Sequence, residues 1–298
     1  MVSMRTKENI YQAVLYVVVG LLVLMMAFPL VYVIGQSFVS ESEWIESGGK
    51  VIIPSQPTLY VYKTLFTESS SLLQAFKISV LRTVLCTVVS LFFTITLGYV
   101  LSRKNLPFGK VILFLLMITI LFDGGLIPTF LVIVNTKVYN TFFVYFITSL
   151  VSSWNALVFR QFFLNIPASL EESARLDGAS EMQIMWRIVL PMSLPVIAAL
   201  SLFTAVGQWN SWFDAAVYIR DDALKPFQLI LRNMFTNPDL QYQMQNGAGM
   251  VTLDPRKRFT PQSLRMAITV IGTVPILCVY PFLQKYFIKG VYMGAVKE

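Results

Sequence analysis

The chain has 298 residues, of which 56% are hydrophobic and only 13% are charged, whereas about a quarter of the residues of a soluble domain are usually charged. This composition excludes a soluble globular protein and indicates a chain that lies largely in lipid. Histidine is absent, and the two cysteines, Cys86 and Cys278, lie in apolar runs. Histidine-based zinc sites, catalytic triads and closely spaced thiol pairs are therefore excluded. The net charge of +7 comes without a basic stripe interleaved with aromatic residues, so no nucleic-acid partner is expected.

Six apolar runs are long enough to cross a bilayer, which takes about 20 largely apolar residues. In chain order they cover residues 10–34, 72–101, 111–134, 139–159, 190–219 and 264–288. The first run is expected to break at Pro29, and it is too long for a cleaved signal peptide. The sequence therefore predicts an all-α polytopic membrane protein with a single transmembrane domain over residues 1–298, without an internal repeat or a second domain.

Basic residues indicate the orientation of the chain, because Lys and Arg gather on the cytoplasmic side of a membrane. The short loop 103–110 is basic, and so is the C-terminal tail with Lys285, Lys289 and Lys297. An even number of spans then places both termini in the cytoplasm of a bacterial cell, with the protein in the plasma membrane. The basic loop between the fifth and sixth spans runs against this orientation, but the rule is weak for long loops.

A polar stretch at residues 165–189 separates the fourth and fifth spans on the predicted cytoplasmic side. Ser169 and Glu172 have the spacing of a capping box, which predicts a short helix that begins at Ser169. Gly178 is a natural end for that helix. A second helix is expected to begin at Ser180 and to run into the fifth span. Two short capped helices beneath the membrane suit a segment that sits in a cleft of a partner and carries its motion into the bilayer.

The spacing of residue types in this stretch is more specific than its caps. The order is Glu-Ser-Ala, three residues, Gly, nine residues, and then Ile-x-Leu-Pro. It resembles the EAA signature of ABC importer permeases, from which only the central Ala differs, since Ser173 stands there. The order of the spans and the tail from Tyr280 to Gly290 are similar to the carbohydrate-uptake branch, namely the maltose-type permeases and the lipoprotein-associated oligosaccharide permeases. By this resemblance the residues that couple to an ATPase are Glu171, Glu172, Ser173, Ala174, Arg175, Leu176, Asp177, Gly178, Ile188, Leu190 and Pro191.

In such permeases this loop docks as a coupling helix on a separate ATPase, so the resemblance implies a transport subunit that is not an enzyme. The chain has no GxxxxGK[ST] phosphate loop, which binds nucleotide phosphates in ATPases. No catalytic residue, metal site or cofactor is expected in this chain, and ATP and Mg²⁺ would bind to the partner. The implied partners are a second homologous permease subunit, a dimer of ATP-binding subunits, and an extracytoplasmic solute-binding protein or lipoprotein. The implied cargo is a sugar or oligosaccharide.

Polar and tryptophan residues within the spans mark a candidate path for the cargo, since polar groups in lipid usually face a cavity or one another. Amides can bind sugar hydroxyls, and indole rings offer flat apolar faces to sugar rings. The candidates are Asp123, Trp154, Asn155, Gln208, Trp209, Asn210, Trp212 and Asp214. Asp123, Gly124, Gly125 and Pro128 also predict a break in the third span. The break is either a gate or re-entrant kink, at which the Asp123 carboxylate caps a half-helix, or a simple kink stabilised by packing. Alternatively, the tryptophans form an aromatic belt and the amides join helices.

Two other functions would also place polar residues in the spans. A secondary transporter or channel could use Asp123 and Asp214 as ion carriers. An intramembrane aspartyl protease needs two aspartates, but the sequences around Asp123 and Asp214 do not match the Tyr-Asp and Gly-x-Gly-Asp patterns of such enzymes. The EAA-like loop favours the importer, because a self-powered carrier has no ATPase to engage.

Overall fold

A computed structural model describes the backbone of residues 4–67, 70–236 and 259–295, and in these ranges every regular element is a helix. The predicted all-α class is therefore confirmed. The chain divides into two compact units, of which the first comprises Met1–Ser70 and Asn233–Val274 and the second comprises Ser71–Arg232 and Pro275–Glu298. Residues 237–258 of the predicted loop before the last span, and Lys297 of the basic tail, lie outside the described residues.

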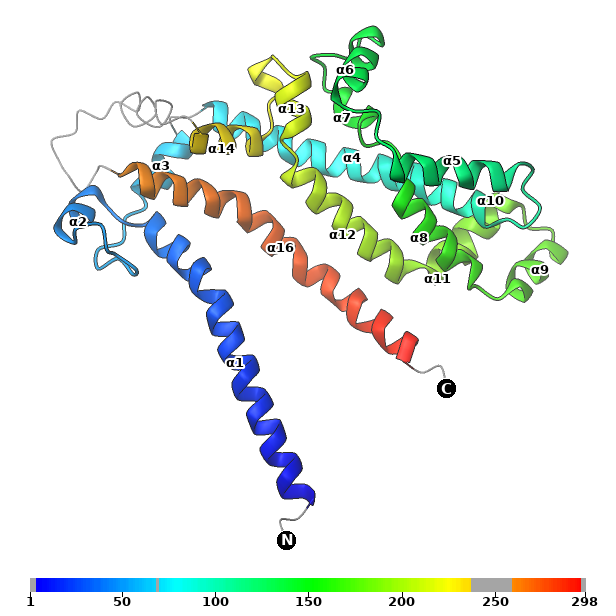
Figure 1. Cartoon of the computed structure of the whole chain (residues 1–298), viewed down its shortest axis with the longest axis horizontal. Coiled ribbons are helices and arrows are strands. Elements are labelled where there is room, and N and C mark those ends of the chain that lie inside the picture. The colour runs from blue at the N-terminus through cyan, green and yellow to red at the C-terminus, as the bar shows by residue number, and fades with distance from the viewer. Residues whose placement is uncertain (1–3, 68–69, 237–258, 296–298) are drawn as a thin grey trace. The chain divides into compact units, whose positions relative to one another are not determined.

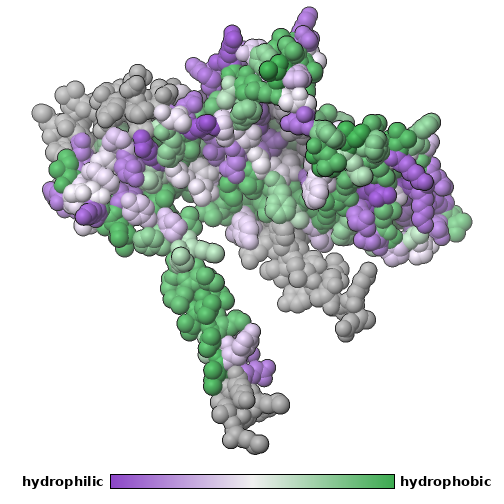
Figure 2. Space-filling view, viewed as in Figure 1, coloured by the Kyte–Doolittle hydropathy of each residue, from purple (hydrophilic) through white to green (hydrophobic). Residues whose placement is uncertain are grey.

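The first unit contains α1 (Met4–Ser37), α2 (Glu41–Glu46), α3 (Tyr60–Thr67) and the first part of α16 (Pro261–Ala295) (Figure 1). Between residues 10 and 34 the side chains of α1 are almost all apolar and mostly exposed (Figure 2), as expected of a helix whose solvent is lipid. The predicted break at Pro29 is wrong, because α1 continues through it to Ser37. A proline removes one backbone donor, and this 34-residue helix continues without that hydrogen bond.

Besides α16 from Pro275 onward, the second unit contains the helices between Ser71 and Arg232, which include the candidate site residues (Figure 1). They are α4 (Ser70–Ser102), α5 (Gly109–Leu121), α6 (Leu126–Asn135), α7 (Val144–Ile147), α8 (Ser153–Leu164), α9 (Ala168–Leu176), α10 (Glu181–Ile184), the π-helix η1 (Met185–Val189), α11 (Leu190–Met192), α12 (Leu194–Asn210), α13 (Phe213–Tyr218), the 3₁₀ turn η2 (Asp222–Leu224) and α14 (Phe227–Thr236). At 1.5 Å per residue α4 is about 50 Å long, enough to cross a bilayer and project beyond it.

Among the described residues, three helices are long and apolar enough to cross a membrane. If each of two bent helix pairs is counted as one span, the number of candidate spans rises to five. The three are α1, α4 and the Pro261–Pro281 part of α16. The bent pairs are α5 with α6, at 116°, and Glu181–Met192 with α12, at 82°. The count of six spans is compatible with this arrangement and stays a prediction.

The break predicted in the third span is present between α5 and α6. Gly125 precedes α6 with a φ of +83°, a conformation that favours glycine. The Asp123 carboxylate accepts a hydrogen bond of 3.1 Å from the Gly125 N–H. Asp123 is not the N-cap of α6, however, because that position belongs to Gly125. Its carboxylate therefore stabilises the turn that leads to the half-helix and does not cap the half-helix itself.

The fourth and fifth predicted spans are not continuous helices. Residues 139–159 form the single turn α7 and the start of α8, and the Ser152 hydroxyl caps α8 by accepting a hydrogen bond of 3.2 Å from the Asn155 N–H. Residues 190–219 are divided into α11, α12 and α13, with interruptions at Ser193 and at Ser211–Trp212. Hydropathy measures how apolar a segment is, and it does not report where hydroxyl caps or prolines bend the backbone.

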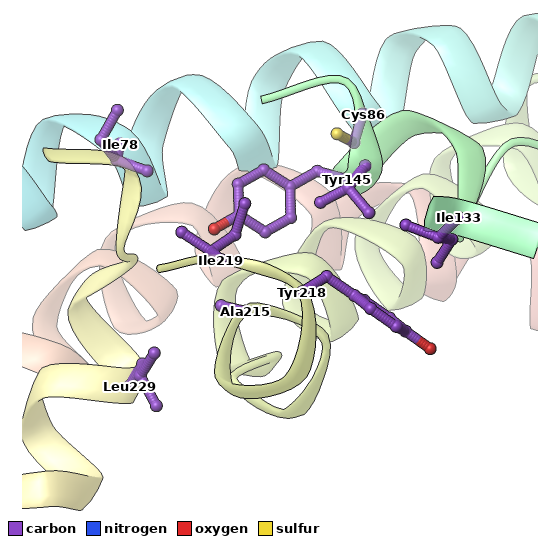
Figure 3. Packing of buried hydrophobic residues seen from close by; sticks show 9 residues of the cluster. Ile78, Cys86, Ile133, Tyr145, Ala215, Tyr218, Ile219 and Leu229 are labelled. Carbon is purple, nitrogen blue, oxygen red and sulfur yellow. The ribbon is translucent and has the colours of Figure 1, made fainter. Parts of the chain in front are cut away.

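Two apolar clusters hold the second unit together. The first joins α4, α6, α7, α13 and α14 and consists of Ile78, Cys86, Ile133, Val144, Tyr145, Ala215, Tyr218, Ile219 and Leu229. Figure 3 shows the Tyr145 ring among these side chains, with Cys86 of α4 nearby. The second cluster lies beneath the polar loop after α8 and consists of Tyr99, Phe159, Phe163, Ile184, Met185, Val189 and Leu200.

Near the second cluster α4 and α8 cross at Gly98. A Cβ added at Gly98 would lie 2.7 Å from the Phe159 Cβ and 3.0 Å from the Ala156 carbonyl oxygen. The side chain of Arg160 donates a hydrogen bond of 2.9 Å to the Leu101 carbonyl. The end of α4 is thus fixed against the helix that leads into the polar loop.

Candidate functional site

The loop predicted to couple to a partner begins with α9 (Ala168–Leu176). The Ser169–Glu172 capping box is wrong, because Pro167 is the N-cap and makes no side-chain cap hydrogen bond. Ser169 is already inside the helix, where its hydroxyl cannot act as the cap. Proline has a fixed φ, which is −57° at Pro167. This angle suits the residue directly before a helix.

The end of α9 is the turn predicted at Gly178. Gly178 has a φ of +82°, and the Ala179 N–H bonds to the Ala174 carbonyl at 2.9 Å while the Gly178 N–H bonds to the Arg175 carbonyl at 3.0 Å. These two hydrogen bonds form a Schellman motif, which requires the left-handed conformation at the glycine. No other atom lies within 4 Å of a Cβ placed at Gly178, so the backbone angle alone selects glycine there.

The second helix begins at Ser180, as predicted. The Ser180 hydroxyl accepts from the Gln183 N–H at 3.4 Å and the Gln183 side chain accepts from the Ser180 N–H at 2.8 Å, which makes a complete capping box. The backbone then turns into η1, a π-helix. Ile188 and Leu190 of the EAA-like pattern pack against the second apolar cluster, whereas Pro191 is exposed. The end of the pattern therefore anchors the loop in the membrane-embedded core.

Four charged side chains enclose the turn between α9 and α10. Arg103, just after α4, donates two hydrogen bonds to the Glu171 carboxylate, one of them 3.1 Å long. Arg175 lies 3.4 Å from Glu171 and 2.8 Å from Glu181, and Glu181 lies 4.0 Å from Arg103. We call this closed set of alternating charges the charge ring. The hydrogen bond that Arg175 donates to the Glu181 carboxylate raises the pKa of the Arg175 guanidinium.

Arg103 was predicted only as a marker of the cytoplasmic side. Its guanidinium also lies 3.9 Å over the Tyr99 ring, at the rim of a groove of about 870 Å³ between residues 99–107 and α9. The contact with Glu171 leaves no local sequence signal, because Glu171 follows Arg103 by 68 residues. Only the fold brings the two together.

The outward surface of α9 is exposed. Glu172, Ser173, Asp177 and Gly178 are exposed, and Leu176 is 89% exposed although it is apolar. No residue of α9 is buried. This side of α9 thus presents an apolar side chain, Leu176, and a carboxylate, Glu172, that makes no ion pair among the described residues.

Two of the predicted cargo-path residues meet at a side chain that sequence analysis missed. Arg82 of α4 is 2% exposed and donates hydrogen bonds to the Gln208 side chain at 3.1 Å and to Asp214 at 3.1 and 2.5 Å. It also donates to the Ser211 carbonyl at 3.3 Å and lies 4.3 Å over the Tyr145 ring. Gln208 and Asp214 lie on either side of the α12–α13 interruption, so Arg82 holds that interruption together.

The predicted tryptophans have different surroundings. Trp209 is buried and packs edge-on against Phe76, with 5.7 Å between ring centroids. Trp212 is half-buried beneath the Arg232 guanidinium, 3.3 Å from it. Trp154 is 65% exposed. Trp209 therefore contributes to the core, whereas Trp154 presents its ring outside it.

The remaining candidates do not gather at one place. The Asn155 amide donates a hydrogen bond of 3.4 Å to the Thr204 hydroxyl and so joins α8 to α12. Asn210 and Asp123 are exposed. Contact of any of these residues with cargo stays a prediction. Among the described residues no group of three or more His, Cys, Asp or Glu side chains could hold a metal ion.

Comparison with known proteins places these features in context. Residues 95–292 match the family model described as "Binding-protein-dependent transport system inner membrane component". The chain is 39% identical to Protein LplC of Bacillus subtilis (strain 168) over 269 residues, which cover 90% of this chain and 88% of that protein. It is 35% identical to the polygalacturonan/rhamnogalacturonan transport system permease protein YtcP of the same organism, over 98% of this chain and 99% of that protein.

A solved structure has the same fold over nearly the whole chain. It is a chain of a bacterial ABC transporter involved in the import of the acidic polysaccharide alginate. The TM-score is 0.83 at 27% identity, with 96% of this chain and 99% of that chain covered. With this coverage the similarity extends over both compact units, and the range matched by the family model includes the loop with α9.

Proposed function

Since the chain belongs to the family of binding-protein-dependent transport system inner membrane components, and is a multi-pass permease subunit of a carbohydrate ABC importer, we propose that it forms half of a translocation pore driven by a separate ATPase. A second, homologous permease subunit completes the pore, and a solute-binding protein or lipoprotein delivers an oligosaccharide to it. Both termini lie in the cytoplasm. Hydrolysis of Mg²⁺-ATP takes place on the ATPase dimer, and this chain converts its movement into alternating access.

The observation that carries the proposal is the exposed and rigidly bent loop around α9. Gly178 and the Ser180 capping box fix the angle between α9 and α10, while the Leu176 side chain is left 89% exposed. A rigid helix transmits displacement, whereas a flexible loop would absorb it. Glu172 makes no ion pair among the described residues and is exposed, so its carboxylate is available to a basic side chain of the ATPase.

The cargo is proposed to be an oligosaccharide, because the relatives named above serve polygalacturonan, rhamnogalacturonan and alginate. The exposed Trp154 ring and the exposed Asn210 amide have the chemistry that a sugar needs, an apolar face and hydrogen-bonding groups.

Purification of the chain in mild detergent from its native host tests the assembly. We expect an ATPase, a second permease and a glycan-binding protein to accompany it. Recovery of the chain alone, still moving solute across liposomes without ATP, would show a secondary carrier and contradict the proposal.

A substitution at Gly178 tests the role of the loop. Valine at a φ of +82° is expected to strain the turn by about 1–2 kcal/mol or more and to lower ATP-driven uptake about tenfold. Asparagine tolerates the left-handed conformation. Gly178→Asn should therefore cost little free energy and keep uptake within about twofold of wild type. Uptake is measured in proteoliposomes with the assembled partners. Normal uptake by Gly178→Val would show that the turn does not couple.

The cargo path has a separate test. Asn210 has no side-chain hydrogen bond among the described residues, and loss of one hydrogen bond to cargo should cost about 1 kcal/mol. Asn210→Ala is therefore expected to raise the half-saturating concentration for uptake about fivefold without change in basal ATP hydrolysis. The buried Trp209 is the contrast, because Trp209→Ala should lower thermal stability. An unchanged uptake curve for Asn210→Ala would remove this residue from the path.

A further inference from the structure

The two adjacent glutamates of α9 point to different environments. The Glu171 side chain is 13% exposed and belongs to the charge ring, whereas Glu172 is exposed. Glu171 thus binds within the chain and Glu172 remains for the partner. One helix turn that supplies a carboxylate to each side is suited to pass force between them.

Apolar packing does not hold α9 in place. None of the residues of α9 is buried, and most of them are polar or charged. Only Ala174 of this helix packs at the margin of the second apolar cluster. The link to the rest of the unit must therefore come largely from polar contacts. Among the described residues, the side-chain hydrogen bonds from α9 to other elements join Glu171 to Arg103 and Arg175 to Glu181.

Arg103 is itself held at the end of α4. Its guanidinium lies 3.9 Å over the ring of Tyr99, which is buried in the second apolar cluster. The Tyr99 hydroxyl donates to the Glu181 carboxylate at 3.0 Å or to the Glu181 carbonyl at 3.1 Å. Tyr99 and Arg103 thus connect the last turn of α4 to both α9 and α10.

These contacts lead along α4 to the second buried arginine. Arg82 lies on the same continuous helix, 20 positions before its last residue, Ser102, which directly precedes Arg103, and about 30 Å from it along the axis. Arg82 joins α4 to α12 and α13 through Gln208 and Asp214. One helix therefore carries an ionic connection to the coupling loop at one end and to the α12–α13 interruption further along.

We propose that Arg103 is a positioning residue that fastens the coupling helix to α4, so that displacement of α9 by the ATPase moves α4 and, through Arg82, the α12–α13 interruption. This inference rests on the proposed function. The charge ring is partly exposed, and exposed ion pairs contribute little to the stability of a protein. Loss of Arg103 should accordingly leave the fold intact and reduce coupling.

A charge exchange tests this role. The variants are Arg103→Glu, Glu171→Arg and the double exchange, each assembled with its partners in proteoliposomes. The readout is cargo transported per ATP hydrolysed. Each single variant is expected to lower this ratio about fivefold or more, the usual lower range for coupling between sites. The double exchange should restore it to within about twofold, because the pair is re-formed with reversed charges.

Lys104 provides the matched control. It is the next residue in the same loop and is exposed, so Lys104→Glu makes the same charge change without breaking the ring. It should keep the wild-type ratio. A normal ratio for Arg103→Glu, or a double exchange no better than the single variants, would overturn the positioning role. The yield of assembled complex is measured for every variant, and a loss of assembly in Arg103→Glu that the double exchange does not repair also counts against the proposal.

The two proposals fail in different ways. If wild-type complexes neither bind an ATPase nor transport with ATP, the proposed function is wrong and the role of Arg103 with it. If the wild type couples ATP hydrolysis to uptake while the Arg103 variants couple equally well, only the positioning role is wrong.

Discussion

Replacement of Arg82 by methionine is expected to destabilise the folded chain by about 3–5 kcal/mol, although it makes α4 more apolar. The substitution leaves the Asp214 carboxylate, 14% exposed, without its ion-pair partner, and only the hydrogen bonds from the Ser211 hydroxyl and the Ala215 N–H remain among the described residues. A largely buried charge without a counter-charge costs this much. It also frees the Gln208 side chain and the Ser211 carbonyl. Membrane insertion of α4 should not suffer, so the defect is one of packing.

The double variant Arg82→Met/Asp214→Leu is expected to recover most of that stability, because apolar pairs often replace a buried ion pair without loss. The measurement is the temperature of aggregation in detergent together with the yield of assembled importer. Arg220→Met is the control, because Arg220 is exposed and its substitution should have little effect. Equal stability of Arg82→Met and wild type would mean that the hydrogen bonds from the Ser211 hydroxyl and the Ala215 N–H to Asp214 are sufficient without the guanidinium.

Alanine at Gly98 is expected to lower thermal stability by several degrees and to reduce assembly. The new Cβ would lie 2.7 Å from the Phe159 Cβ and 3.0 Å from the Ala156 carbonyl oxygen, so α4 and α8 would have to move apart. Overpacking of this kind costs about 1–3 kcal/mol. Because α8 leads directly to α9, the displacement should also lower uptake by the complexes that still form.

Gly207 of α12 provides the matched control for Gly98. It is also a glycine within a helix, but no other atom lies within 4 Å of a Cβ placed there. Alanine is the better helix former by about 1 kcal/mol, so Gly207→Ala should be neutral or stabilising. Both variants are heated in the same detergent. A stability of Gly98→Ala as high as that of Gly207→Ala would show that the α4–α8 crossing has room to adjust.

The coupling loop could be predicted from sequence because its signals are local. Gly178 and Ser180 act through backbone angles and hydrogen bonds within a few residues, and both positions are as predicted. The predicted N-cap at Ser169 is two residues too late, because Pro167 is the N-cap. A capping pattern gives the approximate end of a helix, and the neighbouring proline decides which residue is the cap.

The buried pair could not be predicted in this way. Asp214 was assigned to the cargo path because a carboxylate in a span suggests function, and Arg82 was read as part of an apolar run. Their separation of 132 residues leaves no periodicity or spacing to recognise. The same holds for Arg103 and Glu171, 68 residues apart. Local patterns therefore located the loop around α9, whereas the contacts that connect it to the rest of the chain required the fold.

The distance in sequence between Arg82 and Asp214 also sets an order of events during synthesis. A ribosome adds about 5–20 residues per second. At this rate Asp214 is synthesised about 7–26 s after Arg82. During this interval α4 enters the bilayer with a guanidinium whose carboxylate partner does not yet exist, at a cost of about 2.5–3.5 kcal/mol for an arginine at the centre of a span. The apolar remainder of this 33-residue helix must hold it in the membrane until α13 is made. Arg82 and Asp214 therefore pair late in the biogenesis of the protein, after most of its spans have been inserted.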